Sequence, residues 1–220
     1  MSEVLGALQS PEERERVSIH STVANGDCLF DSVRIVLNHD TSIQVDIPYL
    51  RRVVAQSLLL PHVQATTLHH WYTLFHELSL ERDGETMLHE YAFMQPARGK
   101  PWPLAPNVIL QIAQAMMDRN LFWGEEFAIR VFEQQLQVRC IIVEGIPGHG
   151  LRLQHWNHDG EVEYRPTHYM CLFLQSRHYQ PISYRSQFLF TPAEMPLFLQ
   201  RWLRTACQKE NGGWIRKNTP

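Results

Sequence analysis

The chain has 220 residues, 44% of them hydrophobic, and 20 Lys and Arg stand against 23 Asp and Glu. This composition is ordinary for a globular protein, and no basic stripe favours binding to the phosphates of nucleic acids. No apolar run approaches the roughly 20 residues of a transmembrane helix, and the N-terminal MSEVLGALQSPEERER lacks the pattern of a secretion signal. We therefore expect one domain that works in the cytoplasm, as a monomer, without nucleic acid or membrane among its partners.

The first half of the chain is predicted to be mostly helical. Residues 17–23 alternate with period two and predict a short strand, which is followed by the polar turn Asn25-Gly26-Asp27. Asp46 is the predicted N-cap of a later helix that has Pro48 in its first turn. The helices are predicted over residues 29–37, 47–60, 63–80, 108–116 and 127–135.

Residues 81–106 interrupt this helical pattern. They contain the segment PARGKPWPLAP, which has four prolines among eleven residues, and their apolar spacing is irregular. Loops of this length inside a compact domain are usually functional or inserted. We predict a helical and loop-rich insertion arm over this range.

The second half of the chain is predicted to form a small, mostly antiparallel sheet, so that the fold class is α+β. Thr191, Pro192 and Glu194 form a capping-box pattern, which predicts a C-terminal helix over about 192–207 and frayed residues beyond Lys209. The strands are predicted over 138–143, 151–156, 162–164, 169–174 and 178–184.

Cys28 lies where the opening strand gives way to a helix. The first turn of a helix carries unsatisfied N–H groups and the positive end of its dipole, which stabilise a thiolate, the useful nucleophile. The same turn can direct successive backbone N–H groups at an oxyanion. Taken alone, Cys28 can equally be a small buried residue under a helix start, as Cys140 and Cys171 in apolar strands and Cys207 in a helix are predicted to be. The four cysteines form no Cys-X-X-Cys pair, so the sequence predicts neither a disulfide framework nor a zinc site.

A cysteine nucleophile needs a base that removes its proton and later protonates the leaving amine, and histidine has a suitable pKa range for both steps. Among the 12 histidines, His178 is preferred because it opens a strand directly after the three residues Gln175-Ser176-Arg177. Such a sheet end can pack beside a helix start. The others are predicted to be surface residues, such as His69, His70 and His76, or to lack a metal-binding pattern, such as His149, His155 and His158.

Three segments in order resemble the ovarian-tumour (OTU) family of cysteine proteases, most of which are deubiquitinases. They are Asn25-Gly26-Asp27-Cys28-Leu29-Phe30, the pair Trp123-Gly124 ahead of an apolar helix and strand, and His178-Tyr179. The resemblance implies a papain-like OTU fold over residues 1–220 with a core of about 17–185. It also implies Cys28 as nucleophile, His178 as general base and acid, an oxyanion loop of Asn25, Gly26 and Asp27 with Cys28, and no metal or organic cofactor.

Two positions depart from the family pattern. Asn25 stands where the family usually has aspartate, and Gln180 stands where an aspartate or asparagine commonly orients the histidine. Gln180 shares a strand face with His178 and its carbonyl can accept the imidazole N–H, so it is our first choice for the third member and Asn25 the second. Trp123 is predicted to anchor the helix beneath the site with other core tryptophans, Trp71, Trp102, Trp156 and Trp202, while Gly124 permits a sharp entry.

Ubiquitin or polyubiquitin is the partner that the resemblance implies. We expect the insertion arm to border the surface that binds ubiquitin, through exposed Met87, Tyr91, Phe93 and Trp102. The long arm and the divergent loop favour an OTU enzyme of an intracellular bacterium, an effector acting in the host cytosol. The alternatives are a catalytically weak or dead ubiquitin-binding scaffold, or a papain-like hydrolase of another amide or thioester.

Overall fold

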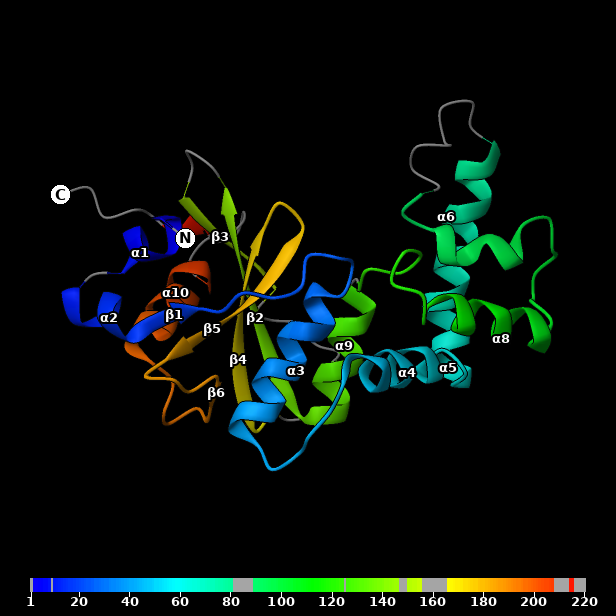
Figure 1. The fold of residues 1–220 in the computed structure, drawn as a ribbon. Helices are drawn as coiled ribbons and strands as arrows, with labels where there is room; N and C mark the ends of the chain where they lie inside the picture. The colour runs from blue at the N-terminus through cyan, green and yellow to red at the C-terminus, as the bar shows by residue number, and fades with distance from the viewer. Residues whose placement is uncertain are drawn as a thin grey trace. The chain divides into compact units, whose positions relative to one another are not determined.

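The computed structural model describes residues 2–8, 10–80, 89–124, 126–146, 150–155, 166–207 and 214–215 (Figure 1). The chain forms two compact units: residues 1–24, 31–44 and 132–220 are unit 1, and residues 25–30 and 45–131 are unit 2. The single catalytic domain over residues 1–220 stays a prediction. None of the described helices is both long and apolar enough to cross a membrane.

Unit 1 is built on a seven-stranded sheet whose order is β1-β5-β4-β2-β3-β7, with β6 paired to β4. Among the described strands, β2 and β4 pair in parallel and the other pairs are antiparallel. The predicted α+β class and mostly antiparallel sheet are therefore confirmed. The strands are β1 (Val17–Ile19), β2 (Val138–Ile146), β3 (Gly150–His155), β4 (His168–Gln175), β5 (His178–Tyr184), β6 (Leu189–Phe190) and β7 (Trp214–Ile215).

A tight hairpin joins β4 to β5. Gln175 belongs to β4 and pairs with His178, so the turn has two residues, Ser176 and Arg177, rather than the three that we predicted. Their φ angles are 51° and 64°, and two consecutive positive φ angles are typical of the type I′ turn that joins hairpin strands. The turn fixes His178 as the first residue of β5, at one end of the sheet.

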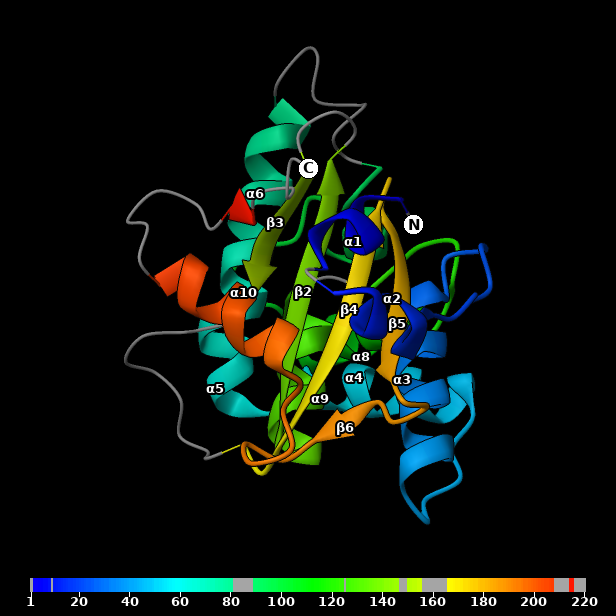
Figure 2. The ribbon, with the colours of Figure 1, turned by 90° about the vertical axis from the view of Figure 1, so that its left-hand side faces the viewer.

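Helices α1 (Ser2–Ala7) and α10 (Leu197–Cys207) lie on one face of this sheet (Figure 2). Their buried side chains, which include Val4, Ala7, Phe198 and Trp202, share one core with apolar strand residues such as Ile141. The next helix along the chain after α1 is α2 (Pro11–Arg16), which begins with a capping box formed by Ser10 and Glu13. Glu13 also accepts two hydrogen bonds from Arg201 of α10, at 2.7 and 2.8 Å. These six-residue helices were not predicted, because such short helices depend on tertiary packing.

The C-terminal segment differs from its prediction in two places. The Glu194 carboxylate accepts the backbone N–H of Thr191 at 3.4 Å, which is one half of the predicted capping box, but α10 begins only at Leu197. Pro196 explains the delay, because a residue that precedes proline is disfavoured in a helix. Residues 214–215, predicted to be frayed, form β7 against Leu151 and Arg152.

Unit 2 is helical, as predicted. Its core contains an aromatic cluster in which Trp71 contacts Phe93 and Phe127 at centroid distances of 5.0 and 5.1 Å, and Phe93 contacts Phe122 at 5.2 Å. Two helices, α3 (Cys28–Asp40) and α9 (Glu126–Leu136), have their first residues in unit 2 and the rest in unit 1. The others are α4 (Ile47–Ser57), α5 (Pro61–Val63), the π-helix η1 (Gln64–Leu68), α6 (His69–Leu80), the 3₁₀ helix η2 (Ala92–Ala97) and α8 (Pro106–Ala115).

The predicted insertion arm contributes to this core. Phe93 is 0% exposed, so its prediction as an exposed ubiquitin contact is wrong, because η2 turns its ring into the aromatic cluster. Tyr91 and Trp102 are half-buried, and Trp102 packs on Tyr72 at 5.3 Å. Met87, Trp156, His149, His158 and the predicted strand 162–164 lie outside the described residues.

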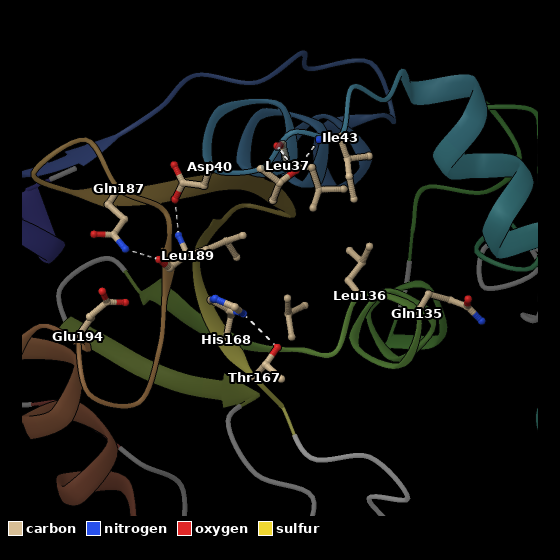
Figure 3. A pocket seen from close by; sticks show the side chains of 12 residues that line it. Leu37, Asp40, Ile43, Gln135, Leu136, Thr167, His168, Gln187, Leu189 and Glu194 are labelled. Atoms are coloured by element: carbon tan, nitrogen blue, oxygen red, sulfur yellow. Dashed lines mark hydrogen bonds between the residues drawn. The ribbon is translucent and has the colours of Figure 1, made fainter.

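A cavity of about 650 Å³ opens in unit 1 at the start of β4 (Figure 3). Several of its polar side chains have partners: the Asp40 carboxylate accepts the backbone N–H groups of Phe188 and Leu189, and His168 Nδ1 lies 3.0 Å from the Thr167 hydroxyl. His178 pairs with the last residue of β4. At roughly 3.3 Å per residue, the cavity and His178 are separated by about 23 Å along this strand, so the cavity is not part of the candidate site.

Candidate active site

The candidate nucleophile begins a helix, as predicted. Cys28 is the first residue of α3 and is 7% exposed, directly after the turn that contains Gly26. Gly26 has φ +87°, and a Cβ at this position would lie 2.4 Å from the carbonyl oxygen of Arg119. Only glycine therefore fits this turn without moving the backbone. The turn also fixes the backbone conformation that leads into Cys28.

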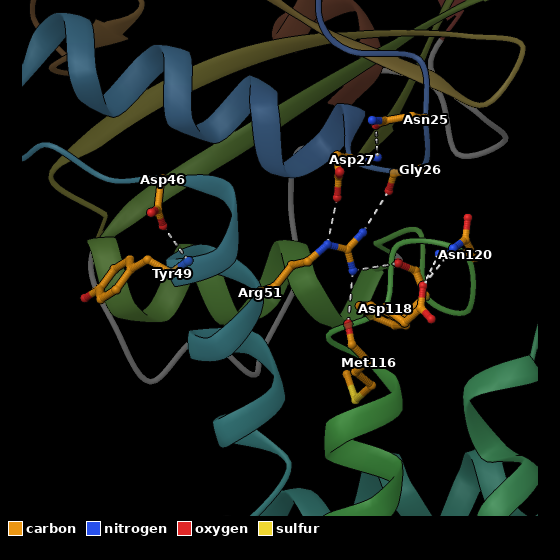
Figure 4. A network of polar contacts seen from close by, with 10 residues as sticks. Asn25, Gly26, Asp27, Asp46, Tyr49, Arg51, Met116, Asp118 and Asn120 are labelled. Carbon is orange, nitrogen blue, oxygen red and sulfur yellow. Dashed lines mark hydrogen bonds and ion pairs between the residues drawn. The ribbon is translucent and has the colours of Figure 1, made fainter.

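The side chains of the turn are engaged within unit 2 (Figure 4). The Asn25 side-chain oxygen accepts the backbone N–H of Asp27 at 3.3 Å, and the buried Asp27 carboxylate accepts a hydrogen bond from Arg51 at 2.7 Å. The Asp27 N–H is thus occupied by Asn25, and its carboxylate is paired rather than available as an acid. Sequence reasoning missed Arg51, although its signal was present: a charged residue at helical spacing from the apolar Val54 and Leu58.

The Trp123-Gly124 pair has divided roles. Gly124 has φ +83°, and a Cβ there would lie 2.8 Å from the Leu29 side chain, which agrees with the predicted sharp entry. Trp123 is 49% exposed, so its predicted place in the core is wrong, while Trp71 and Trp202 are buried as expected. The Trp123 indole instead lies beside the Gly26 turn, 3.2 Å from where a Cβ at Gly26 would be.

The candidate base is bound by a residue that sequence reasoning missed. In unit 1, the Thr22 hydroxyl oxygen lies 3.2 Å from His178 Nε2 and donates to the Tyr179 carbonyl oxygen at 2.6 Å. A hydroxyl has one hydrogen and a carbonyl can only accept, so the oxygen of Thr22 must accept from His178. His178 therefore carries a hydrogen on Nε2, and in the neutral ring Nδ1 holds the basic lone pair.

The Thr22 segment is held in place by α3. The buried Asp31 carboxylate accepts the backbone N–H of Val23 at 3.0 Å and a hydrogen bond from Arg34 at 2.8 Å. Gln180, predicted to orient His178, pairs with Phe173 in the strand register, and among the described residues it makes no hydrogen bond with His178. Cys28 belongs to unit 2 and His178 to unit 1.

The other buried cysteines are placed to be inert, as predicted. Cys140 and Cys171 are 0% and 1% exposed in β2 and β4. Burial raises the pKa of both thiols, and the nearby Glu133 charge raises the pKa of Cys140 further. A raised thiol pKa lowers the thiolate fraction and with it the reactivity.

We expect iodoacetamide at neutral pH to label Cys28 well before Cys140 or Cys171, by about tenfold or more. Peptide mass spectrometry of the native protein, in a Cys207→Ser background, gives the three rates. Cys28→Ala is the control and should remove the fast labelling. Fast labelling of Cys140 or Cys171 in folded protein would contradict this assignment.

A second histidine, His20, directly follows β1 and contacts β5. His20 Nε2 is 2.8 Å from the Ser183 hydroxyl, and its ring packs on Phe188 at 4.7 Å. Burial, followed by the charge of His39, lowers the pKa of His20 below its ordinary value. Between the lowered folded pKa and the ordinary value of about 6.5, the folded state binds fewer protons than the unfolded state.

The contribution of His20 to stability should therefore be complete above about pH 6.5 and decline as the pH falls through its lowered folded pKa. The free energy of unfolding, measured by urea denaturation from pH 7.5 to pH 5, should fall less steeply for His20→Gln than for the wild type. Parallel curves would show that His20 does not titrate differently in the two states.

The solved structures to which the chain is similar include OTU domains. One is an ovarian-tumour (OTU) domain in complex with ubiquitin, 15% identical with a TM-score of 0.46 over 80% of this chain and 74% of that chain. A second is the structure of an OTU deubiquitinase from Wolbachia pipientis wMel bound to ubiquitin. It is 14% identical to this chain, with a TM-score of 0.45 over 78% of this chain and 98% of that chain. Another structure of the Wolbachia OTU deubiquitinase is 15% identical, with a TM-score of 0.45 over 85% of this chain and 96% of that chain.

No protein-family model and no curated protein matches the chain. The solved structures belong to the family that the three sequence segments resemble.

Proposed function

We propose that this protein is a cysteine-type deubiquitinase that hydrolyses the isopeptide bond after the C-terminal glycine of ubiquitin. The observation that carries the proposal is the place of Cys28 as first residue of α3, where helix N–H groups favour a thiolate. The Thr22 contact, which leaves Nδ1 of His178 as the basic nitrogen, supports the role of His178 as base. Ubiquitin as substrate rests on the resemblance of the three segments to the OTU family.

The reaction has two stages. His178 Nδ1 takes the thiol proton while Cys28 Sγ attacks the carbonyl carbon of the terminal glycine, and the resulting imidazolium protonates the leaving lysine amine as the C–N bond breaks. Water, deprotonated by the neutral His178, then attacks the thioester and releases the ubiquitin carboxylate and the Cys28 thiol. Backbone N–H groups of the loop that contains Gly26 and Cys28 stabilise the oxyanion of both tetrahedral intermediates.

The remaining assignments extend this proposal. Thr22 takes the orienting role at His178 in place of Gln180, and because it is uncharged it positions the imidazolium without stabilising it as a carboxylate would. Half-buried Tyr91 and Trp102 are proposed to border the ubiquitin-binding surface. We propose that the protein acts in the cytoplasm, and in the host cytosol if it is a bacterial effector.

Hydrolysis of a fluorogenic amide of the ubiquitin C-terminus tests this function. The wild type should release the fluorophore, whereas Cys28→Ala and His178→Ala should each lower kcat/KM by at least about a thousandfold. Cys207→Ser, which changes a thiol outside the proposed site, is the control and should retain full activity. Ubiquitin binding without hydrolysis would instead indicate a scaffold, and neither binding nor hydrolysis would indicate another substrate.

A further inference from the structure

Arg51 is a charged side chain inside unit 2. It lies on α4, whose start is fixed by the Asp46 side chain accepting the backbone N–H of Tyr49 at 2.7 Å, and it is 3% exposed. Burial of a guanidinium is costly unless its hydrogen-bonding groups are satisfied and its charge is neutralised. The partners of Arg51 therefore indicate what this buried charge holds in place.

The guanidinium makes four hydrogen bonds (Figure 4). Nε donates to Asp27 Oδ1 at 2.7 Å, and Nη2 donates to the carbonyl oxygen of Gly26 at 3.0 Å. Nη1 donates to the carbonyl oxygens of Met116 and Phe122, at 3.0 and 2.9 Å. One side chain thus attaches the turn before Cys28 to the segment that follows α8.

The same guanidinium supports the chain after Cys28. Its central carbon lies 4.3 Å from the centroid of the Phe30 ring, within the distance of a cation–π contact. Arg51 therefore contacts Gly26 and Asp27 ahead of the nucleophile and Phe30 behind it. A shift of the guanidinium would change the direction of Cys28 and of the N–H groups around it.

Arg51 also balances a charge beside the nucleophile. Asp27 directly precedes Cys28, and an unpaired carboxylate at that position would repel both a thiolate and the oxyanion that forms during attack. The ion pair with Arg51 removes this repulsion while keeping Asp27 as an anchor. Lysine could neutralise Asp27, but as a point charge it could not reproduce the planar set of four bonds.

We infer that Arg51 is the positioning residue of the nucleophile loop, setting the direction of the oxyanion donors and protecting the Cys28 thiolate from the charge of Asp27. This inference rests on the proposed function. It separates into an electrostatic effect on Cys28, which alkylation measures without ubiquitin, and a geometric effect on catalysis, which hydrolysis measures.

The test compares Arg51→Gln, Arg51→Lys and the double variant Asp27→Asn/Arg51→Gln, with Arg130→Gln as the control. Arg130 pairs with Glu126 on the exposed surface of α9, so its loss should change neither rate. For Arg51→Gln, iodoacetamide labelling of Cys28 at neutral pH should slow by about tenfold, because the unpaired Asp27 carboxylate repels the thiolate. For ubiquitin-amide hydrolysis, kcat should fall about a hundredfold with KM changed by less than about threefold.

The double variant distinguishes the two effects and keeps the test decisive if Arg51→Gln alone unfolds. Without the Asp27 charge, the labelling rate of Cys28 should return to within about threefold of wild type. The kcat should stay at least about tenfold below wild type, because the hydrogen bond from Arg51 to the Gly26 carbonyl oxygen is missing. Arg51→Lys should restore labelling more than kcat. Wild-type kcat in the double variant, or wild-type labelling in folded Arg51→Gln, would overturn the inference. An inactive wild type would refute the proposed function instead, and labelling would still test the effect on Cys28.

Discussion

Replacing Thr22 with valine is expected to lower kcat for hydrolysis of a ubiquitin C-terminal amide by about a hundredfold, with little change in KM. The hydroxyl accepts from His178 Nε2 at 3.2 Å and donates to the Tyr179 carbonyl at 2.6 Å, so it fixes both the tautomer and the ring direction. Valine keeps the shape and removes both bonds. The base then samples unproductive directions, which slows proton transfer but leaves substrate binding unchanged.

Two comparisons separate this role from a general loss of stability. Thr22→Ser keeps the hydroxyl and should recover kcat to within about threefold, while Thr73→Val removes a hydroxyl that donates to the His69 carbonyl on α6 and should have no effect. Gln180→Ala should be milder than Thr22→Val. A larger loss in Gln180→Ala would return the orienting role to Gln180, as its position on the strand predicted.

Replacing Gly26 with alanine should both destabilise unit 2 and remove activity. The added Cβ would lie 2.4 Å from the Arg119 carbonyl oxygen, and the backbone has φ +87°. Left-handed backbone costs an L-residue about 1–2 kcal/mol and overpacking about 1–3 kcal/mol, so the free energy of unfolding should fall by about 3 kcal/mol. Relief of the clash would move the turn, and kcat should fall by about a hundredfold or more.

Gly99 provides the matched control for this substitution. It has φ +68°, but no atom lies within 4 Å of where a Cβ would be. Gly99→Ala should therefore cost only the backbone strain, about 1 kcal/mol in urea denaturation, with unchanged kcat. Equal losses of stability in the two variants would show that the approach to Arg119 is not what requires glycine at position 26.

Local sequence patterns predicted most of the sheet and helices. The start of the first strand at Val17, the Asp46 cap and the hairpin before His178 each depend on neighbours within a few residues, which periodicity and turn chemistry indicate. The strand ends at Ile19, earlier than the predicted residue 23. Cys28 at a helix start and His178 at a strand start were predicted for the same reason. What these positions contact could not be read in this way.

The missed features depend on contacts between residues distant in sequence. Thr22 meets His178 across 156 positions, and Arg51 reaches Met116 and Phe122 across 65 and 71 positions. The proline-rich, irregular segment around Phe93 predicts an exposed side chain, yet the aromatic cluster buries it. Contacts between such distant residues produce no periodic pattern in the sequence. Their only local sign is a single residue of unexpected polarity or size on a helix face.

The most direct test of Cys28 as the nucleophile of a deubiquitinase uses ubiquitin that bears a thiol-reactive group in place of its C-terminal carboxylate. Incubated with the wild type, it should form one covalent adduct, which intact-mass measurement detects and peptide mapping places on Cys28. The adduct should be absent from Cys28→Ala and form at least about tenfold more slowly in His178→Ala. An adduct on another cysteine, or none with folded wild-type protein, would contradict the account.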